Sequence, residues 1–265
     1  MSTVPATLVK ELRELTGAGM MDCKRALQEA DGDLEAARKL LRERGIAQAG
    51  KRAGRETTEG KVGYHIADSH ASMVAIGCET EPVSNNDEFL AYGKRVLDAV
   101  HEGGLDAAAA LEDERIELVA KLGENIVVRG ATRLERTEGE TITGYAHPPL
   151  NKIGVLVKAR GGADEALRNL AMHIAASRPL YRTRGDVPET DVAAERAIYE
   201  KQPDVLAKPE SVRERIVDGM IGKRFFAESV LEDQAWVREP SKTVAQALAG
   251  EGVEVLEFVR YAVAE

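Results

Sequence analysis

The sequence predicts a mixed α+β protein with a three-helix head, a duplicated core of antiparallel hairpins packed with helices, and a helical-hairpin arm inserted in the second core unit. Three observations support this. Apolar residues recur at helical spacing over residues 4–46, one hairpin–helix–strand pattern occurs twice, and a later segment has two helical runs separated by prolines. The predicted boundaries are 1–55 for the head and linker, 56–140 for the first core unit, 141–265 for the second, and 186–236 for the arm.

Composition narrows the class of protein. A chain of 265 residues is long enough for two or three domains with cores of their own. A net charge of −9 argues against a general nucleic-acid binder, which needs Lys and Arg to neutralise phosphate. Apolar runs stay far below the roughly 20 residues of a membrane span. The first residues lack the apolar segment of a signal peptide, and two cysteines are too few for a disulfide framework. We therefore expect a cytoplasmic protein with no direct nucleic-acid partner and no membrane.

The head is predicted from apolar spacing and from residues that end helices. Gly17 and Gly19 stop the first helix, Asp33 caps the third, and Gly45 is expected to end it. Met20 and Met21 follow the glycine turn, and we expect at least one to be exposed as a soft contact for a partner. The inward faces are Leu8, Leu12 and Leu15, then Cys23, Ala26, Leu27 and Ala30, then Leu34, Ala37, Leu40 and Leu41.

Residues 47–60 are small and charged and show no apolar periodicity, so they are predicted to form a linker. Lys51, Arg52 and Arg55 leave two interpretations open, contact with RNA or phosphate and simple solvation, of which solvation is the more ordinary.

The first core unit begins with a hairpin, in which 62–66 alternates and 73–78 is a buried strand. A helix then runs from Asp87, more helix is expected over 107–122, and a strand begins at Asn125. Between the buried strand and the first helix lies the segment Thr80-Glu81-Pro82-Val83, which we call the tip. Glu79 and Glu81 beside Pro82 predict a stiff, exposed, acidic structure that acts on a partner protein.

The second core unit resembles the first. Residues 63–66 match 144–147, residues 73–76 match 153–156, and a helix over 164–176 matches that over 87–100. The last strands, 126–129 and 257–260, also match, so we predict a duplicated unit whose second copy carries an insertion.

The insertion is the arm. Helical runs over 192–202 and 212–226 flank Pro203 and Pro209, which predicts an antiparallel helical hairpin that projects from the core and binds a partner or a second copy. The alternative is a hairpin that folds flat onto its own core. A short helix capped by Ser241 or Thr243 and a strand over 253–263 close the chain.

The sequence offers little for catalysis. It contains no phosphate-binding loop and no nucleophile elbow, and its five histidines lack metal-ligand spacing. A thiol enzyme using Cys78 with His147 and a metal at His65 and His70 stay as minor alternatives. We therefore predict a protein that works by binding, with no cofactor, no metal and no covalent chemistry.

Several motifs in order resemble bacterial elongation factor Ts. The longest lies at the amino terminus, where Leu8-Val9-Lys10-Glu11-Leu12-Arg13 is followed by Thr16-Gly17-Ala18-Gly19-Met20-Met21-Asp22-Cys23-Lys24. The others are Ala26-Leu27, Gly32-Asp33-Leu34-Glu35-Ala36-Ala37, Cys78-Glu79-Thr80, Met172-His173-Ile174-Ala175-Ala176-Ser177-Arg178-Pro179 and Pro240-Ser241-Lys242-Thr243-Val244.

The resemblance implies a function in translation elongation, guanine nucleotide exchange on elongation factor Tu, and it implies a ubiquitin-associated-like head. It assigns Leu12, Met20, Met21 and His147 to contacts with that partner. It places the tip, Thr80, Glu81, Pro82 and Val83, near the partner's nucleotide, where the tip disturbs Mg²⁺ binding. The arm is expected to reach a distant domain of the partner or to form a homodimer.

Two features depart from the family pattern. Glu81 and Pro82 stand where the family usually has aspartate and phenylalanine, and the extra carboxy-terminal helical module of some members is expected to be absent. We expect Pro82 to hold Glu81 extended, with Val83 as a small apolar contact. A different class of function also stays open, an adaptor whose head binds nascent chains or ribosomes.

Overall fold

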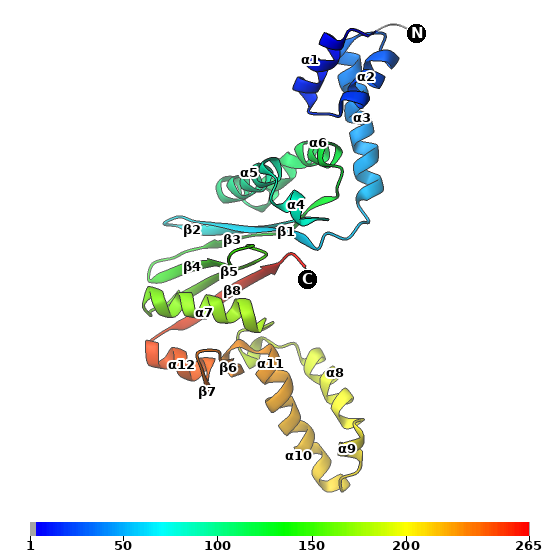
Figure 1. Cartoon of the computed structure of the whole chain (residues 1–265). Helices are drawn as coiled ribbons and strands as arrows, with labels where there is room; N and C mark the ends of the chain where they lie inside the picture. The colour runs from blue at the N-terminus through cyan, green and yellow to red at the C-terminus, as the bar shows by residue number, and fades with distance from the viewer. Residues whose placement is uncertain (1–3, 265) are drawn as a thin grey trace.

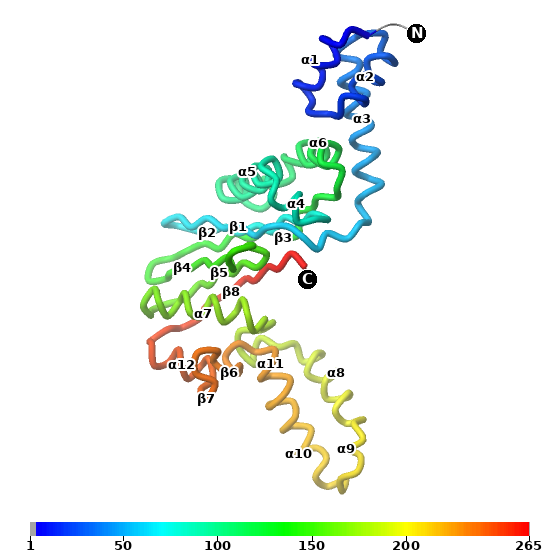
Figure 2. The backbone as a smooth tube through the Cα atoms, in the orientation of Figure 1, coloured from blue at the N-terminus to red at the C-terminus, as the bar shows by residue number. Residues whose placement is uncertain are grey.

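The computed structural model describes residues 4–264, which form an elongated molecule with helices at both ends and two three-stranded sheets between them (Figure 1). The head lies at one end and the arm at the other, and after the arm the chain returns to the second sheet (Figure 2). This confirms the predicted α+β class. Across residues 4–264, no helix combines the length and the apolar character needed to span a membrane.

The head consists of α1 (Ala6–Thr16), α2 (Met20–Glu29) and α3 (Leu34–Arg52) around a small core that includes Leu12, Cys23 and Leu27. Asp33 caps α3 by accepting a hydrogen bond from the Ala36 amide at 2.9 Å, as predicted. The predicted helix end at Gly45 is wrong, and so is the linker over 47–52, because α3 continues to Arg52. A β-carbon on Gly45 would lie 3.4 Å from Ala120 of the core, so packing outweighs the weak helix propensity of glycine.

The first core unit is a sheet in the order β1-β2-β3, covered by helices on its outer face. Asn86 caps the main covering helix by accepting from the Glu88 amide at 2.9 Å. The elements are β1 (Glu59–Ile66), β2 (His70–Cys78), α4 (Glu81–Ser84), α5 (Asp87–Gly103), a 3₁₀ segment (Leu105–Leu111), α6 (Glu112–Leu122) and β3 (Ile126–Glu135).

The second core unit repeats this arrangement with the order β4-β5-β8 and α7 on its outer face. Thr243 forms a capping box with Gln246 at the start of α12, one of the two caps predicted. The elements are β4 (Glu140–Ala146), β5 (Ile153–Arg160), α7 (Asp164–Ser177), β6 (Ala235–Trp236), β7 (Glu239–Thr243), α12 (Val244–Glu251) and β8 (Glu254–Ala262).

The two sheets stack face to face, so the central strands are buried on both sides. In β2, Met73 and Ala75 point toward the other sheet, whereas Val74 and Ile76 point toward α5. The duplicated architecture is therefore as predicted, but the residue-by-residue matches predicted between the strands of the two core units are wrong. Tyr64 lies over Gly144 of the other sheet, whereas its predicted counterpart, Tyr145, packs against α7. A slip of one residue reverses the faces of a strand, and the apolar pattern on both faces hides such a slip.

The arm projects away from the second sheet as an antiparallel pair of helices (Figure 1). Tyr199 and Val217 are buried in the seam between its helices. The elements are α8 (Glu189–Glu200), α9 (Pro203–Leu206), α10 (Glu210–Met220), a π-helical segment (Ile221–Phe226) and α11 (Ala227–Ser229), with short 3₁₀ turns at Arg184–Asp186 and Leu231–Asp233.

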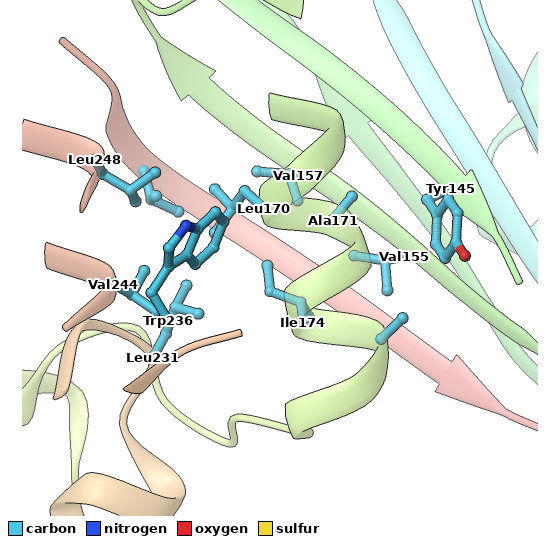
Figure 3. Packing of buried hydrophobic residues seen from close by; sticks show 12 residues of the cluster. Tyr145, Val155, Val157, Leu170, Ala171, Ile174, Leu231, Trp236, Val244 and Leu248 are labelled. Carbon is cyan, nitrogen blue, oxygen red and sulfur yellow. The ribbon is translucent and has the colours of Figure 1, made fainter. Parts of the chain in front are cut away.

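The chain that returns from the arm is fixed to the core by apolar packing. Trp236 and Leu231 lie against Leu170 and Ile174 of α7, with Val244 of α12 beside them (Figure 3). Buried aromatic and aliphatic area of this kind holds the base of the arm on the second core unit.

Candidate partner-binding site

The tip follows β2 directly, at one end of the stacked sheets. Thr80, Glu81 and Pro82 are exposed, whereas Val83 is half-buried and packs against the core under α5. The expectation of an extended Glu81 is wrong, because Glu81 begins the short helix α4 and Pro82 occupies its first turn. Proline fits there since its fixed φ is helical and its missing N–H would be unpaired in a first turn anyway. The tip is therefore a helical turn that presents a carboxylate to solvent.

Hydrogen bonds to the Glu124 side chain hold the start of the tip to the neighbouring turn between α6 and β3. The Glu124 carboxylate accepts hydrogen bonds from the Glu79 amide at 3.1 Å and from the Thr80 amide at 3.0 Å. The Thr80 hydroxyl donates to the same carboxylate at 2.5 Å. Sequence reasoning missed Glu124, since a Gly-Glu-Asn turn carries no signal of a distant contact.

His147 lies in the loop between β4 and β5, and its side chain is exposed. Its Nδ1 is 2.8 Å from the Tyr145 hydroxyl, which orients the ring. The loop also contacts β1, since the Val62 amide donates to the Asn151 carbonyl at 2.7 Å. Glu59 of β1 lies opposite Cys78 in the register, so the loop and the tip belong to the same end of the two sheets.

The head residues divide into one buried and two exposed. Met20 is 55% exposed and Met21 is 63% exposed, which confirms the expectation of an accessible methionine. Leu12 is fully buried in the head core, so its side chain supports the head rather than offering a surface to a partner. Leu15, 59% exposed, was assigned to the core because it shares the apolar face of Leu12. It lies in the last turn of α1, beyond the packed part of that face.

The two thiols are poorly suited to nucleophilic chemistry. Burial raises the pKa of the Cys78 thiol to about 12, and the Glu124 carboxylate adds to the effect. Burial also raises the pKa of Cys23. Because the thiolate is the nucleophile, a thiol with such a pKa stays protonated at neutral pH. Within residues 4–264, His, Cys, Asp and Glu side chains form no group of three or more that could hold a metal ion.

Two of the three basic residues at the end of α3 and just after it contact other side chains of the protein. The Arg55 guanidinium lies 3.4 Å from the Glu79 carboxylate, and Arg52 donates to Gln48 at 3.1 Å. Lys51 is exposed near the end of α3. Arg55 therefore helps to hold Glu79, the residue just before the tip, a role that the prediction of a solvated linker did not include.

Comparisons with known proteins give a consistent result. A family model described as "Elongation factor TS" matches residues 79–265. Elongation factor Ts of Thioalkalivibrio sulfidiphilus is 42% identical over 99% of this chain and 93% of that protein. The protein of the same name from Photobacterium profundum is 41% identical over 100% of this chain and 93% of its own length. For that of Escherichia coli O139:H28 the identity is 40%, with the same coverage of both chains.

The family model covers well over half of the chain, and relatives above 30% identity match it over nearly their whole length. The observed fold, with its head, duplicated core and projecting arm, agrees with the architecture expected from the resemblance. The chain therefore belongs to the elongation factor Ts family, whose members act in translation elongation.

Proposed function

We propose that this protein is a guanine nucleotide exchange factor of the cytoplasm. It binds elongation factor Tu with GDP, disturbs the binding of Mg²⁺ and phosphate, and promotes the release of GDP so that GTP can bind. The action is protein–protein binding without covalent chemistry. The observation that carries the proposal is an exposed acidic tip, held by Glu124, at the same end of the two stacked sheets as the exposed His147.

Exchange requires that the factor bind the nucleotide-free partner more tightly than the nucleotide-bound partner. By linkage, nucleotide then weakens the binding of the factor by the same ratio, which lets GTP release it. A coupling free energy of about 5.5 kcal/mol would carry the partner from 99% nucleotide-bound to 1%. In GTPases Mg²⁺ neutralises phosphate charge, so a carboxylate brought near it, or a shift of its ligands, lowers nucleotide affinity.

Glu81 and Pro82 make this tip differ from the usual family pattern. An aromatic side chain at the second position would bury about 150–250 Å² on insertion, which proline cannot match. Pro82 instead stiffens the first turn of α4, and Val83 packs beneath it. We infer that the effect on the partner comes from a rigid backbone and from the Glu81 carboxylate.

Stopped-flow release of fluorescent GDP from elongation factor Tu tests the function. The wild-type protein should accelerate the release strongly, and Glu81→Ala should lower the maximal rate by about 10-fold, the scale of one lost electrostatic contact of 1.4 kcal/mol. Glu138→Ala, which removes an exposed carboxylate at the opposite end of the sheets, serves as the matched control. A wild-type protein that leaves GDP release unchanged would refute exchange and favour an adaptor.

The arm is the second contact surface in the proposal, with the partner or with a second copy of this chain. Ile198 of α8 and Leu206 of α9 are each more than half exposed, so they offer apolar area for either contact. Sedimentation of the free protein distinguishes the two cases, since only self-association gives a concentration-dependent dimer.

A further inference from the structure

We propose that Glu124 is a positioning residue for exchange. Its carboxylate, in the turn between α6 and β3, sets where the tip begins and how it is oriented. The inference rests on the proposed exchange function and adds to it a residue outside the tip. Glu124 acts through its hydrogen bonds to Thr80 and to the Glu79 amide, whereas the tip itself contacts the partner.

The first step of the argument is the number of bonds that converge on one carboxylate. Oε2 of Glu124 accepts from two successive amides, those of Glu79 and Thr80, and Oε1 accepts from the Thr80 hydroxyl. These residues lie between the last residue of β2 and the first of α4. Hydrogen bonds to an ionised acceptor are shorter and stronger than neutral ones. The exit of the chain from the sheet is therefore fixed in both position and direction.

The second step concerns Thr80, the residue before the first turn of α4. A threonine in that place commonly accepts a hydrogen bond from an amide of its own helix. Here its hydroxyl donates to Glu124 instead. The start of the tip is thus tied to a turn 44 residues later in the sequence rather than to its own helix.

The third step is that the hydrogen bonds run in both directions between the segment 79–80 and the turn 124–125, an arrangement that we call the clamp. While Glu124 accepts from the Glu79 amide, the Glu79 carboxylate accepts from the Asn125 amide at 2.7 Å. The Arg55 guanidinium lies beside the same carboxylate, only 21% of whose side chain is exposed. Two segments that exchange carboxylate–amide bonds resist sliding past each other, because a shift breaks bonds in both directions.

The fourth step is that the turn carrying Glu124 is itself held in place. Asn125 is buried, and its side-chain amide donates to the Arg55 carbonyl at 2.9 Å and to the Ala53 carbonyl at 3.5 Å. These carbonyls lie within three residues of the end of α3, the long helix of the head. The clamp therefore joins the tip, the turn before β3 and the end of the head helix in one hydrogen-bonded junction.

The test compares Glu124→Ala, Glu124→Gln and the control Glu117→Ala, which removes an exposed carboxylate from α6. Alanine removes every acceptor, whereas glutamine keeps a carbonyl for the amides and an amide group that can bond the Thr80 hydroxyl. Glu124→Ala should lower the maximal rate of GDP release from elongation factor Tu by about 10-fold or more, the scale on which small misplacements act. Its half-saturating concentration should change much less. Glutamine should recover most of the rate, and the control should match wild type.

Hydrogen exchange of the free protein supplies a readout that does not depend on the partner. In Glu124→Ala the amides of Glu79 and Thr80 should exchange faster, while those of β2 keep their protection. Three results would overturn the inference: unchanged exchange at these two amides, a rate equal to that of the control, or a glutamine variant as slow as alanine. If wild type itself fails to release GDP while the amide result holds, the proposed function fails and the clamp stands as a structural device.

Discussion

Two apolar side chains of the head occupy opposite environments. Leu12 lies at the centre of the head core with Cys23 and Leu27, whereas Met21 is exposed on α2. A core of this size depends on each of its large side chains, because few others share the burial. Met20 and Met21 contribute little to that core, so they are free to contact a partner with flexible, polarizable side chains.

This difference gives a prediction for the head. The double substitution Met20→Ala/Met21→Ala should weaken binding to nucleotide-free elongation factor Tu by about 1–3 kcal/mol, the range of a contact hot spot. Its thermal unfolding should match wild type. Leu12→Ala should instead destabilise the head by about 2–5 kcal/mol through the cavity it leaves. Calorimetric titration and thermal unfolding measure the two quantities, and a destabilised methionine variant would place those side chains in the core after all.

At the scale of elements, the base of the arm is joined to the core by a buried polar cluster. The His173 ring on α7 has Nε2 2.9 Å from Gln234 Oε1, and the Val237 amide donates to its Nδ1 at 3.4 Å. Gln234 in turn donates to the Ser177 and Glu228 carbonyls. This pattern requires a neutral imidazole with the proton on Nε2. The hydrogen bonds at the base of the arm thus match the neutral form of one buried histidine.

The cluster predicts a pH dependence of stability. Burial lowers the pKa of His173, and the hydrogen bond to Gln234 opposes this only in part. Its pKa in the folded protein is thus below the unfolded value of about 6.5, so the unfolded state binds more protons as pH falls below 6.5 and stability declines. His173→Gln should reduce the loss of unfolding free energy between about pH 6.5 and 5, by at most 1.4 kcal/mol per pH unit.

Denaturant unfolding at several pH values measures the effect, with His147→Gln as the control, since His147 is exposed. Equal pH slopes in wild type and His173→Gln would contradict the assignment of a neutral, buried imidazole to His173.

For the whole molecule, the close approach of the two sheets sets the geometry. A β-carbon on Gly154 would lie 2.3 Å from Val62 Cγ1, and one on Gly144 would lie 2.4 Å from the Tyr64 ring. Glycines at these points let β1 lie directly on β4 and β5. The strand β1 pairs with β2, which leads into the tip, and the loop with His147 follows β4. The distance between the two sheets therefore also sets the distance between the tip and His147.

Gly154→Ala should therefore destabilise the protein by about 1–3 kcal/mol through overpacking. Combining it with Val62→Ala removes the nearest methyl group, so the double variant should be more stable than the sum of the single effects predicts. Chemical unfolding of the four proteins in this cycle measures the coupling. Additive effects would show that the sheets separate freely at this point.

Features that depend on neighbouring residues can be predicted from the amino-acid sequence alone. Gly17 ends α1 in the left-handed conformation and Asp33 caps α3, both as predicted from the sequence. Caps, turns and periodicity act within a few residues, so a single chain reveals them. The motifs around Met20 and Glu79 also indicated the family, because a long match of motifs in the same order can be recognised without a structure.

Features that depend on residues far apart in the chain become visible only in the folded protein. Gly45 continues a helix because Ala120 packs on it, and Leu12 and Leu15 share an apolar face yet differ in burial. The tip is a helical turn held by Glu124, and two matched tyrosines face opposite layers. At Gly45 a contact with a distant residue outweighs a local preference worth about 1 kcal/mol, and a local pattern cannot name such a distant partner.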